Sequence, residues 1–207
     1  MIKKIIKNPF LWAFIIGIIL LHVFREFSIL RKSAPPPLVI VPDWSLINQD
    51  GKRVSKSDFL GKIIVADFFF TSCPTICPKL TQSMKEVYER FKHNPNLVFL
   101  SVTVDPKTDT PDVLKKYLEN YGINYNNWMA LTGSKEEVFD VVINKMKIHI
   151  GDKEPVHGVD NIYDIPHLAE LVLFDKEGNL RGKFKTDSVE LSALVRAIQY
   201  LLEIEVN

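Results

Sequence analysis

The residues best suited to chemistry are the two cysteines in Cys73-Pro74-Thr75-Ile76-Cys77. They stand where an apolar, strand-like run gives way to a helical pattern, so both thiols can face one side of the first helical turn. The unpaired N–H groups and dipole of a helix start favour thiolate over thiol. A thiolate pair suits either disulfide exchange or a soft metal ion. The alternative is a purely structural pair, either two small buried side chains or an inactive disulfide.

The cysteine count limits which metal the pair could hold. Thiolates favour Cu(I), zinc and iron–sulfur clusters, whereas neutral imidazole suits copper and zinc. With only 2 cysteines, one chain cannot supply the four thiolates of a cluster, and structural zinc would need two further ligands. Two cysteines so close together also cannot form the disulfide framework of a small secreted scaffold. Copper(I), which accepts fewer ligands, fits this inventory best.

Hydrophobic periodicity predicts the elements that position the cysteines. Residues Ile63–Phe70 are nearly all β-branched or aromatic, which indicates a central strand buried on both faces. After Cys77, apolar residues recur with helical spacing. Residues Leu97–Val104 predict a second strand, and Thr110-Pro111 predicts the N-cap and first residue of a helix that ends near Tyr121. The cysteines would then lie at the carboxyl end of a central strand, where open α/β sheets place their sites.

Further elements are predicted on both sides of this β-α-β-α unit. The segment Gln49-Asp50-Gly51-Lys52 is a turn signal that predicts an N-terminal hairpin. Ser134 and Glu137 match a capping box for a helix that runs to about Met146. The last part of the chain predicts a strand hairpin and a closing helix, with the strands at Leu168–Phe174 and Leu180–Lys185. Together the elements predict a thioredoxin-like three-layer α/β sandwich with an N-terminal hairpin extension.

The N-terminus is predicted to be a membrane anchor. Residues Phe10–Phe24 form an apolar run behind Lys3, Lys4 and Lys7, the charge layout of a cytoplasmic N-terminus followed by an exported chain. A span needs about 20 mostly apolar residues, so the run must extend beyond Phe24. A cleaved signal peptide is the alternative, but no small-x-small cleavage site follows. The predicted organisation is a single transmembrane helix in residues 1–32, a proline-rich linker in 33–41, and a domain in 42–207 on the periplasmic or extracytoplasmic side of the inner membrane.

Overall charge gives no reason to expect nucleic acid as a partner. Lys and Arg total 26 and Asp and Glu total 25, for a formal net charge of +1. Nucleic-acid binding proteins neutralise phosphates with an excess of positive charge, and this chain has almost none. Its 207 residues are enough for one ordinary domain and an appendage.

Four segments in this order resemble the Sco/SenC family, copper chaperones and thiol-disulfide reductases that assemble the dinuclear copper centre of cytochrome c oxidase. They are Gly61-Lys62, Phe70–Pro78, Val102–Pro111 and Leu131–Val138, in a resemblance from about Pro42 to Leu202. The resemblance implies a two-cysteine, one-histidine Cu(I) site, in which His167 joins Cys73 and Cys77, with binding of Cu(II) left open. It also implies delivery of copper to, or preparation of the thiols of, the copper-bearing oxidase subunit. Other periplasmic copper or thiol carriers would be further partners.

The chain departs from the family pattern beside the expected histidine ligand. The family usually has an Asp-His pair where this chain has Pro166-His167, and the nearest acid is Asp164. Carboxylates commonly orient metal-bound imidazoles, so this difference bears on the orientation of the ring. The arginine common in the DPxxDT segment is also replaced, by Thr108. Asp105, in the same segment, is expected either to hold the cysteine loop or a partner, or to cap the following turn.

A dedicated thiol-disulfide oxidoreductase is the main alternative function. In that case Cys73 and Cys77 would act on a partner's cysteines without carrying metal, with one thiol attacking and the other resolving. Their spacing differs from that of a general thioredoxin by one residue, which predicts a narrow substrate range. A peroxidase is disfavoured, because its activated cysteine needs a nearby arginine and none lies near this motif. Thiol-disulfide reductase activity is thus the one enzymatic role left open.

Overall fold

The computed structural model describes residues 9–30, 36–123, 127–151, 154–155, 163–164 and 169–204. The chain divides into two units, residues 1–35 with residue 207, and residues 36–206. The first unit contains one described helix, α2 (Pro9–Leu30). No helix within the described residues is both long and apolar enough to cross a membrane. The prediction of a single transmembrane helix is therefore wrong, since Arg25 and Glu26 interrupt the apolar run before it reaches the ~20 residues that a span needs.

A seven-stranded sheet with the order β2-β1-β5-β4-β3-β8-β9 forms the centre of the second unit. Its strands are β1 (Ser45–Asn48), β2 (Arg53–Ser55), β3 (Ile63–Phe69), β4 (Leu97–Thr103), β5 (Trp128–Thr132), β8 (Glu170–Phe174) and β9 (Leu180–Lys185). Strands β3, β4 and β5 are parallel, and the strands on both sides of them pair antiparallel. Every residue of β3 and β4 is buried, which confirms the prediction of β3 as a central strand and of β4 as a second strand.

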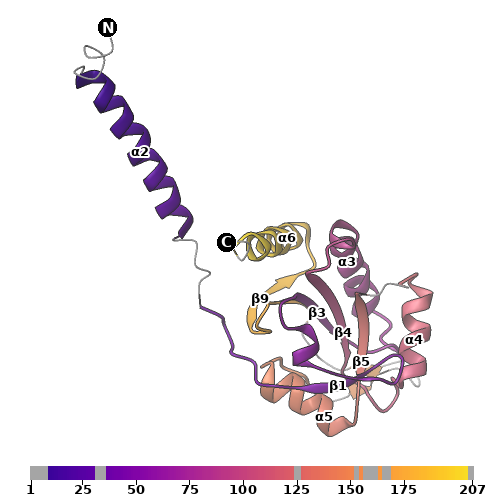
Figure 1. Cartoon of the computed structure of the whole chain (residues 1–207). Helices are drawn as coiled ribbons and strands as arrows, with labels where there is room; N and C mark the ends of the chain where they lie inside the picture. The colour runs from indigo at the N-terminus through magenta and orange to yellow at the C-terminus, as the bar shows by residue number, and fades with distance from the viewer. Residues whose placement is uncertain are drawn as a thin grey trace. The chain divides into compact units, whose positions relative to one another are not determined.

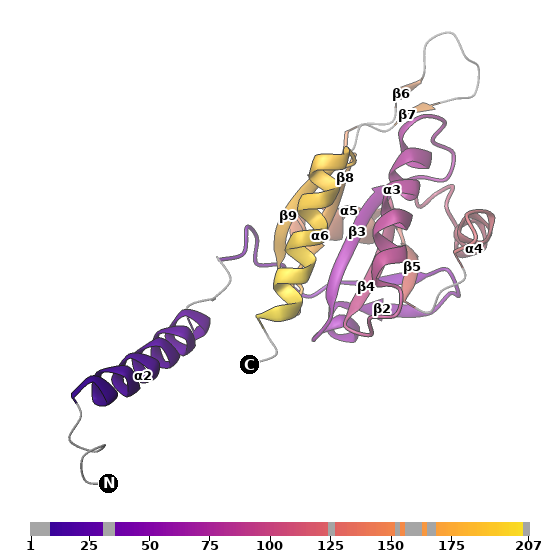
Figure 2. The same cartoon turned by 90° about the horizontal axis from the view of Figure 1, so that it is seen from above.

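Helices cover both faces of this sheet and give the domain three layers (Figures 1 and 2). Helices α3 (Ile76–Phe91) and α6 (Ser188–Glu203) lie on one face, and α5 (Lys135–Phe139) lies on the other. Helix α4 (Pro111–Asn120) packs beside β5 and α3. The shorter elements are the 3-10 helix η1 (Lys56–Phe59), the π-helix η2 (Asp140–Lys145), and a two-stranded pair, β6 (Glu154–Pro155) and β7 (Tyr163–Asp164).

The helix predicted to run from Ser134 to about Met146 forms as two successive pieces. The capping box at its start is confirmed: the Ser134 hydroxyl accepts from the Glu137 N–H at 3.1 Å, and the Glu137 carboxylate accepts from the Ser134 N–H at 2.9 Å. After Phe139 the α-helical pattern gives way to the π-helix η2. The sequence therefore predicted the helical region but not its change of hydrogen-bond spacing.

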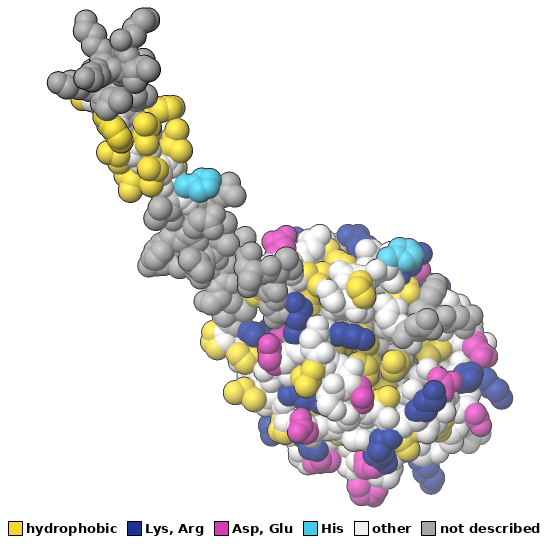
Figure 3. Space-filling view, viewed as in Figure 1, with side chains coloured by type: hydrophobic (Ala, Val, Ile, Leu, Met, Phe, Trp, Pro, Cys, Tyr) yellow, Lys and Arg dark blue, Asp and Glu magenta, His cyan; other side chains and the backbone are white. Residues whose placement is uncertain are grey.

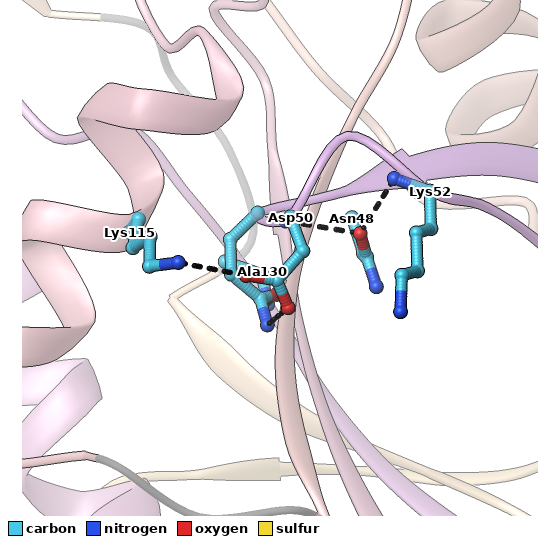
Figure 4. A network of polar contacts seen from close by, with 6 residues as sticks. Asn48, Asp50, Lys52, Lys115 and Ala130 are labelled. Carbon is cyan, nitrogen blue, oxygen red and sulfur yellow. Dashed lines mark hydrogen bonds and ion pairs between the residues drawn. The ribbon is translucent and has the colours of Figure 1, made fainter.

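The predicted N-terminal hairpin is also present, as β1 and β2. Its turn is organised by Asn48, whose side-chain oxygen accepts from the N–H groups of Asp50 at 3.0 Å and Lys52 at 2.9 Å (Figure 4). Lys115 of α4 reaches the Asp50 carboxylate at 3.0 Å, and the Ala130 N–H of β5 donates to the Gln49 side chain at 3.1 Å. The hairpin is thus attached to the parallel part of the sheet.

Candidate functional site

The two cysteines meet where β3 gives way to α3. Cys73 lies in the turn after the strand, where its N–H donates to the Phe70 carbonyl at 3.2 Å, and Cys77 is the second residue of the helix. The Cys77 N–H points at the Cys73 sulfur, with a distance of 3.4 Å from nitrogen to Sγ. The two cysteines are in the thiol form rather than joined in a disulfide, and both are buried, with 6% of Cys73 and 1% of Cys77 exposed. The residues between them, Pro74 to Ile76, are exposed.

The same surroundings shift the two thiols in opposite directions. Burial opposes ionisation of Cys73, but N–H groups of Cys77, Thr75 and Ile76 and the Cys77 thiol outweigh it and lower the pKa of Cys73. Burial raises the pKa of Cys77, and the negative charges of Cys73 and Asp67 raise it further. The pair therefore consists of one thiol that ionises readily and one that keeps its proton.

Asp109 ties the cysteine turn to the segment that follows β4. Its carboxylate accepts from the Thr71 N–H at 3.1 Å, from the Thr71 hydroxyl, and from the Thr103 hydroxyl. Burial raises the pKa of Asp109 above its ordinary value, and the hydrogen bonds from Thr103 and Thr71 offset only part of this rise. Asp105, which was expected either to hold the cysteine loop or a partner or to cap the following turn, accepts with its carbonyl from the N–H groups of Thr108 and Asp109, both at 3.0 Å. Asp109 is part of the DPxxDT segment. Its position directly before Thr110, an N-cap residue, indicates the start of a helix and does not reveal a contact with the cysteine turn.

A second buried acid, Asp67, lies on β3 ahead of the cysteine turn. Its side chain is fully buried, and within the described residues neither carboxyl oxygen has a hydrogen-bond partner at normal geometry. Burial raises the pKa of Asp67 to about 7, an effect that Ser101, opposite it on β4, only partly offsets. A signal for this group is visible in the sequence, since Asp67 is the one charged residue in the otherwise apolar strand β3.

The expected third ligand, His167, lies outside the residues that the structure describes, as does Pro166 beside it. Among the residues that are described, no group of three or more His, Cys, Asp or Glu side chains could hold a metal ion. His149 is exposed. What the described part of the chain does provide is two sulfur donors at one helix start, and this donor chemistry fits Cu(I). A third ligand would have to come from outside the described residues.

The sheet order and the cysteine turn define the class of protein. Parallel strands flanked by antiparallel ones, with helices on both faces and a cysteine pair between the central strand β3 and helix α3, make this a thioredoxin-like thiol protein. Residues 32–203 match the family model described as SCO1/SenC. The chain belongs to the SCO1/SenC family.

Known relatives are similar in sequence and in fold. The SCO1 protein homolog of Bacillus subtilis (strain 168) is 36% identical over 123 residues, which are 56% of this chain and 64% of that protein, just under two thirds of its length. The copper-bound structure of ScoI from Bradyrhizobium japonicum superposes with a TM-score of 0.64 and 26% identity, over 77% of this chain and 99% of that one. BsSco, a member of the Sco family of cytochrome c oxidase assembly proteins in which a disulfide switch was identified, gives 0.67 and 28%, over 83% and 98%.

Proposed function

We propose that this chain is a copper(I)-binding chaperone that serves the copper centre of cytochrome c oxidase. Cys73 and Cys77 hold the metal ion, and His167 is the third ligand. The observation that carries the proposal is the convergence of two reduced thiols at the start of α3, with the Cys77 nitrogen 3.4 Å from the Cys73 sulfur. Copper in the Bradyrhizobium japonicum relative and the oxidase-assembly role of BsSco support it.

The two thiols contribute differently to copper binding. Cys73, with its lowered pKa, offers a thiolate that is stabilised by the helix N–H groups. Cys77, with its raised pKa, must lose a proton before it can bind a metal ion, so copper competes with that proton. Copper affinity should therefore increase with pH across the neutral range. Release to the copper-bearing subunit, or to another copper or thiol carrier, proceeds by ligand exchange on the side where Pro74 to Ile76 are exposed.

An anaerobic Cu(I) titration of the reduced protein against a competing chelator tests the proposal. Wild type should bind one copper ion per chain, and Cys73→Ala should lose high-affinity binding because a single thiolate remains. Ser72→Ala, which changes an exposed neighbour in the same turn, is the matched control and should bind like wild type. Full binding by Cys73→Ala would refute the proposal.

A thiol-disulfide oxidoreductase without metal is the second candidate, and the opposite pKa shifts of the two cysteines favour it. Cys73 would attack a partner disulfide as a thiolate, and Cys77 would then resolve the mixed disulfide. The disulfide switch of BsSco is consistent with such exchange. The test is reduction of a disulfide-bonded peptide that copies the cysteines of the receiving subunit, with insulin as a generic substrate. Rapid turnover of insulin would contradict the narrow range expected here.

We also propose that the domain acts outside the cytoplasm. Three lysines followed by an apolar run form the layout of an N-terminal export segment. Fractionation of cells that produce the full chain, with protease added to intact spheroplasts, tests this location. Protection of the domain from protease until the cells are lysed would contradict it.

A further inference from the structure

We infer that Asp109 is a positioning residue for the cysteine site, which holds the turn between Thr71 and Cys73 in the shape that keeps Cys73 reactive. The inference rests on the proposed use of Cys73 as the reacting thiol. Within the described residues the Asp109 carboxylate accepts hydrogen bonds from Thr71 and Thr103, so it acts on the cysteine turn through Thr71.

The contacts of the Asp109 carboxylate are the first step of the argument. It is fully buried and accepts three hydrogen bonds, two from Thr71 and one from Thr103. The three partner groups are the Thr71 N–H and the hydroxyls of Thr71 and Thr103. All three donate to the carboxylate and none accepts from it, which is the arrangement that suits an ionised carboxylate. Burying such a group is costly unless it is fully hydrogen-bonded, and here its donors are the cysteine turn and the end of β4.

The position of Asp109 in the fold is the second step. Its own N–H donates to the Asp105 carbonyl at 3.0 Å, and the next residue, Thr110, is the N-cap of α4. Asp109 is therefore held from both sides, by the end of β4 and by the start of a helix. A carboxylate fixed in this way can impose a position on Thr71, rather than merely following it.

The path from Thr71 to the reactive sulfur is the third step. Thr71 is bound through both its N–H and its hydroxyl, and Cys73 follows two residues later. The Cys73 N–H closes the same turn on the Phe70 carbonyl at 3.2 Å, which brings Sγ to 3.4 Å from the Cys77 nitrogen. If Thr71 is released, the sulfur is no longer held over the helix start, where N–H groups stabilise the thiolate.

Replacing Asp109 should therefore change the chemistry of Cys73. In Asp109→Ala we expect the rate of Cys73 alkylation by iodoacetamide at neutral pH to fall about tenfold, because the sulfur is no longer held beside the N–H groups of the helix start. The dithiol form would lose the same stabilisation, so the reduction potential should become more negative by about 30 mV for a tenfold change in the equilibrium constant. Peptide mapping by mass spectrometry separates alkylation of Cys73 from that of Cys77.

Two variants separate positioning from loss of stability. Asn48→Ala is the matched control, because Asn48 is also buried and also accepts from two backbone N–H groups (Figure 4), and strands β5 and β4 lie between its strand β1 and β3 in the sheet. It should destabilise the fold and leave both readouts at their wild-type values. Asp109→Asn keeps an acceptor oxygen, and its NH₂ can donate to a rotated threonine hydroxyl. This variant should restore most of the Cys73 reactivity that Asp109→Ala loses.

The inference is overturned if Asp109→Ala changes the alkylation rate and the potential no more than Asn48→Ala does. If Asp109→Ala does not fold, Thr71→Val decides, because it removes one of the two Thr71 contacts and keeps the N–H. An alkylation rate of wild-type size in Thr71→Val would then overturn the inference, and an intermediate rate would support it. Neither readout involves copper, so a failure of copper binding in the wild type would count against the proposed function alone.

Discussion

Replacing the buried carboxyl of Asp67 by an amide should stabilise the folded domain above neutral pH. Asp67 is fully buried, and within the described residues its oxygens have no partner at normal hydrogen-bond geometry. Ionisation in this position is unfavourable, since Ser101 and the Asp67 backbone only partly offset the lost hydration of the carboxylate. Asp67→Asn keeps nearly the same shape and cannot ionise, so it removes this cost.

The shift in pKa sets both the sign and the size of the effect. The pKa of Asp67 in the folded protein is about 7, against 3.8 in the unfolded chain. Between these values the folded state binds more protons than the unfolded state, so stability falls as pH rises. The full shift of about 3 units corresponds to about 4 kcal/mol, an upper limit. The free energy of unfolding of Asp67→Asn should not decrease in this way. The difference between this variant and wild type should therefore grow from about pH 4 to about pH 7.

Urea unfolding of the reduced protein at pH 5, 6, 7 and 8 measures the effect. The free energy of unfolding of wild type should decrease over this series relative to Asp67→Asn, most steeply below pH 7. Asp43→Asn, which replaces an exposed carboxyl, is the control and should follow wild type. Parallel curves for wild type and Asp67→Asn would refute the assignment of a raised pKa to this group.

Two further predictions concern the cysteine pair and a turn. Cys73 should be alkylated before Cys77 at neutral pH, because its pKa is lowered and that of Cys77 is raised; equal rates by peptide mapping would contradict this. Gly178→Ala should lower the free energy of unfolding by about 1–2 kcal/mol, because φ is +71° and the new Cβ would lie 2.7 Å from the Lys56 side chain. Gly51→Ala, with φ of +73° and open space around it, should cost less, and an equal loss of urea stability would count against a clash.

The buried strands next to the cysteines could be predicted because their composition allows little else. Strand β3 consists mostly of β-branched and aromatic residues, β4 combines such residues with two leucines, and both strands are fully buried. Strand β5 (Trp128–Thr132) was not predicted. It has the sequence WMALT, whose methionine, alanine and leucine favour helix as readily as strand. Pairing with β4 and β1, which a single sequence does not display, makes it a strand.

Only the parts of the candidate site that form a pattern of neighbouring residues could be predicted from the sequence. The spacing of Cys73 and Cys77 at a strand-to-helix transition was enough to place both thiols together. The contact between Asp109 and Thr71 joins residues 38 positions apart, so no local pattern reveals it. His167 as a ligand rests on the family resemblance, and it stays a prediction.

Figure 3 shows basic and acidic side chains interspersed over one face of the domain.

The most direct test of the copper site is X-ray absorption at the copper edge of the reduced, Cu(I)-loaded protein, compared with His167→Ala. The proposed ligands predict two sulfur donors and one nitrogen donor in wild type, with both sulfurs kept and the nitrogen lost in the variant. A wild-type spectrum without sulfur ligands would contradict the central claim that Cys73 and Cys77 together hold the metal ion.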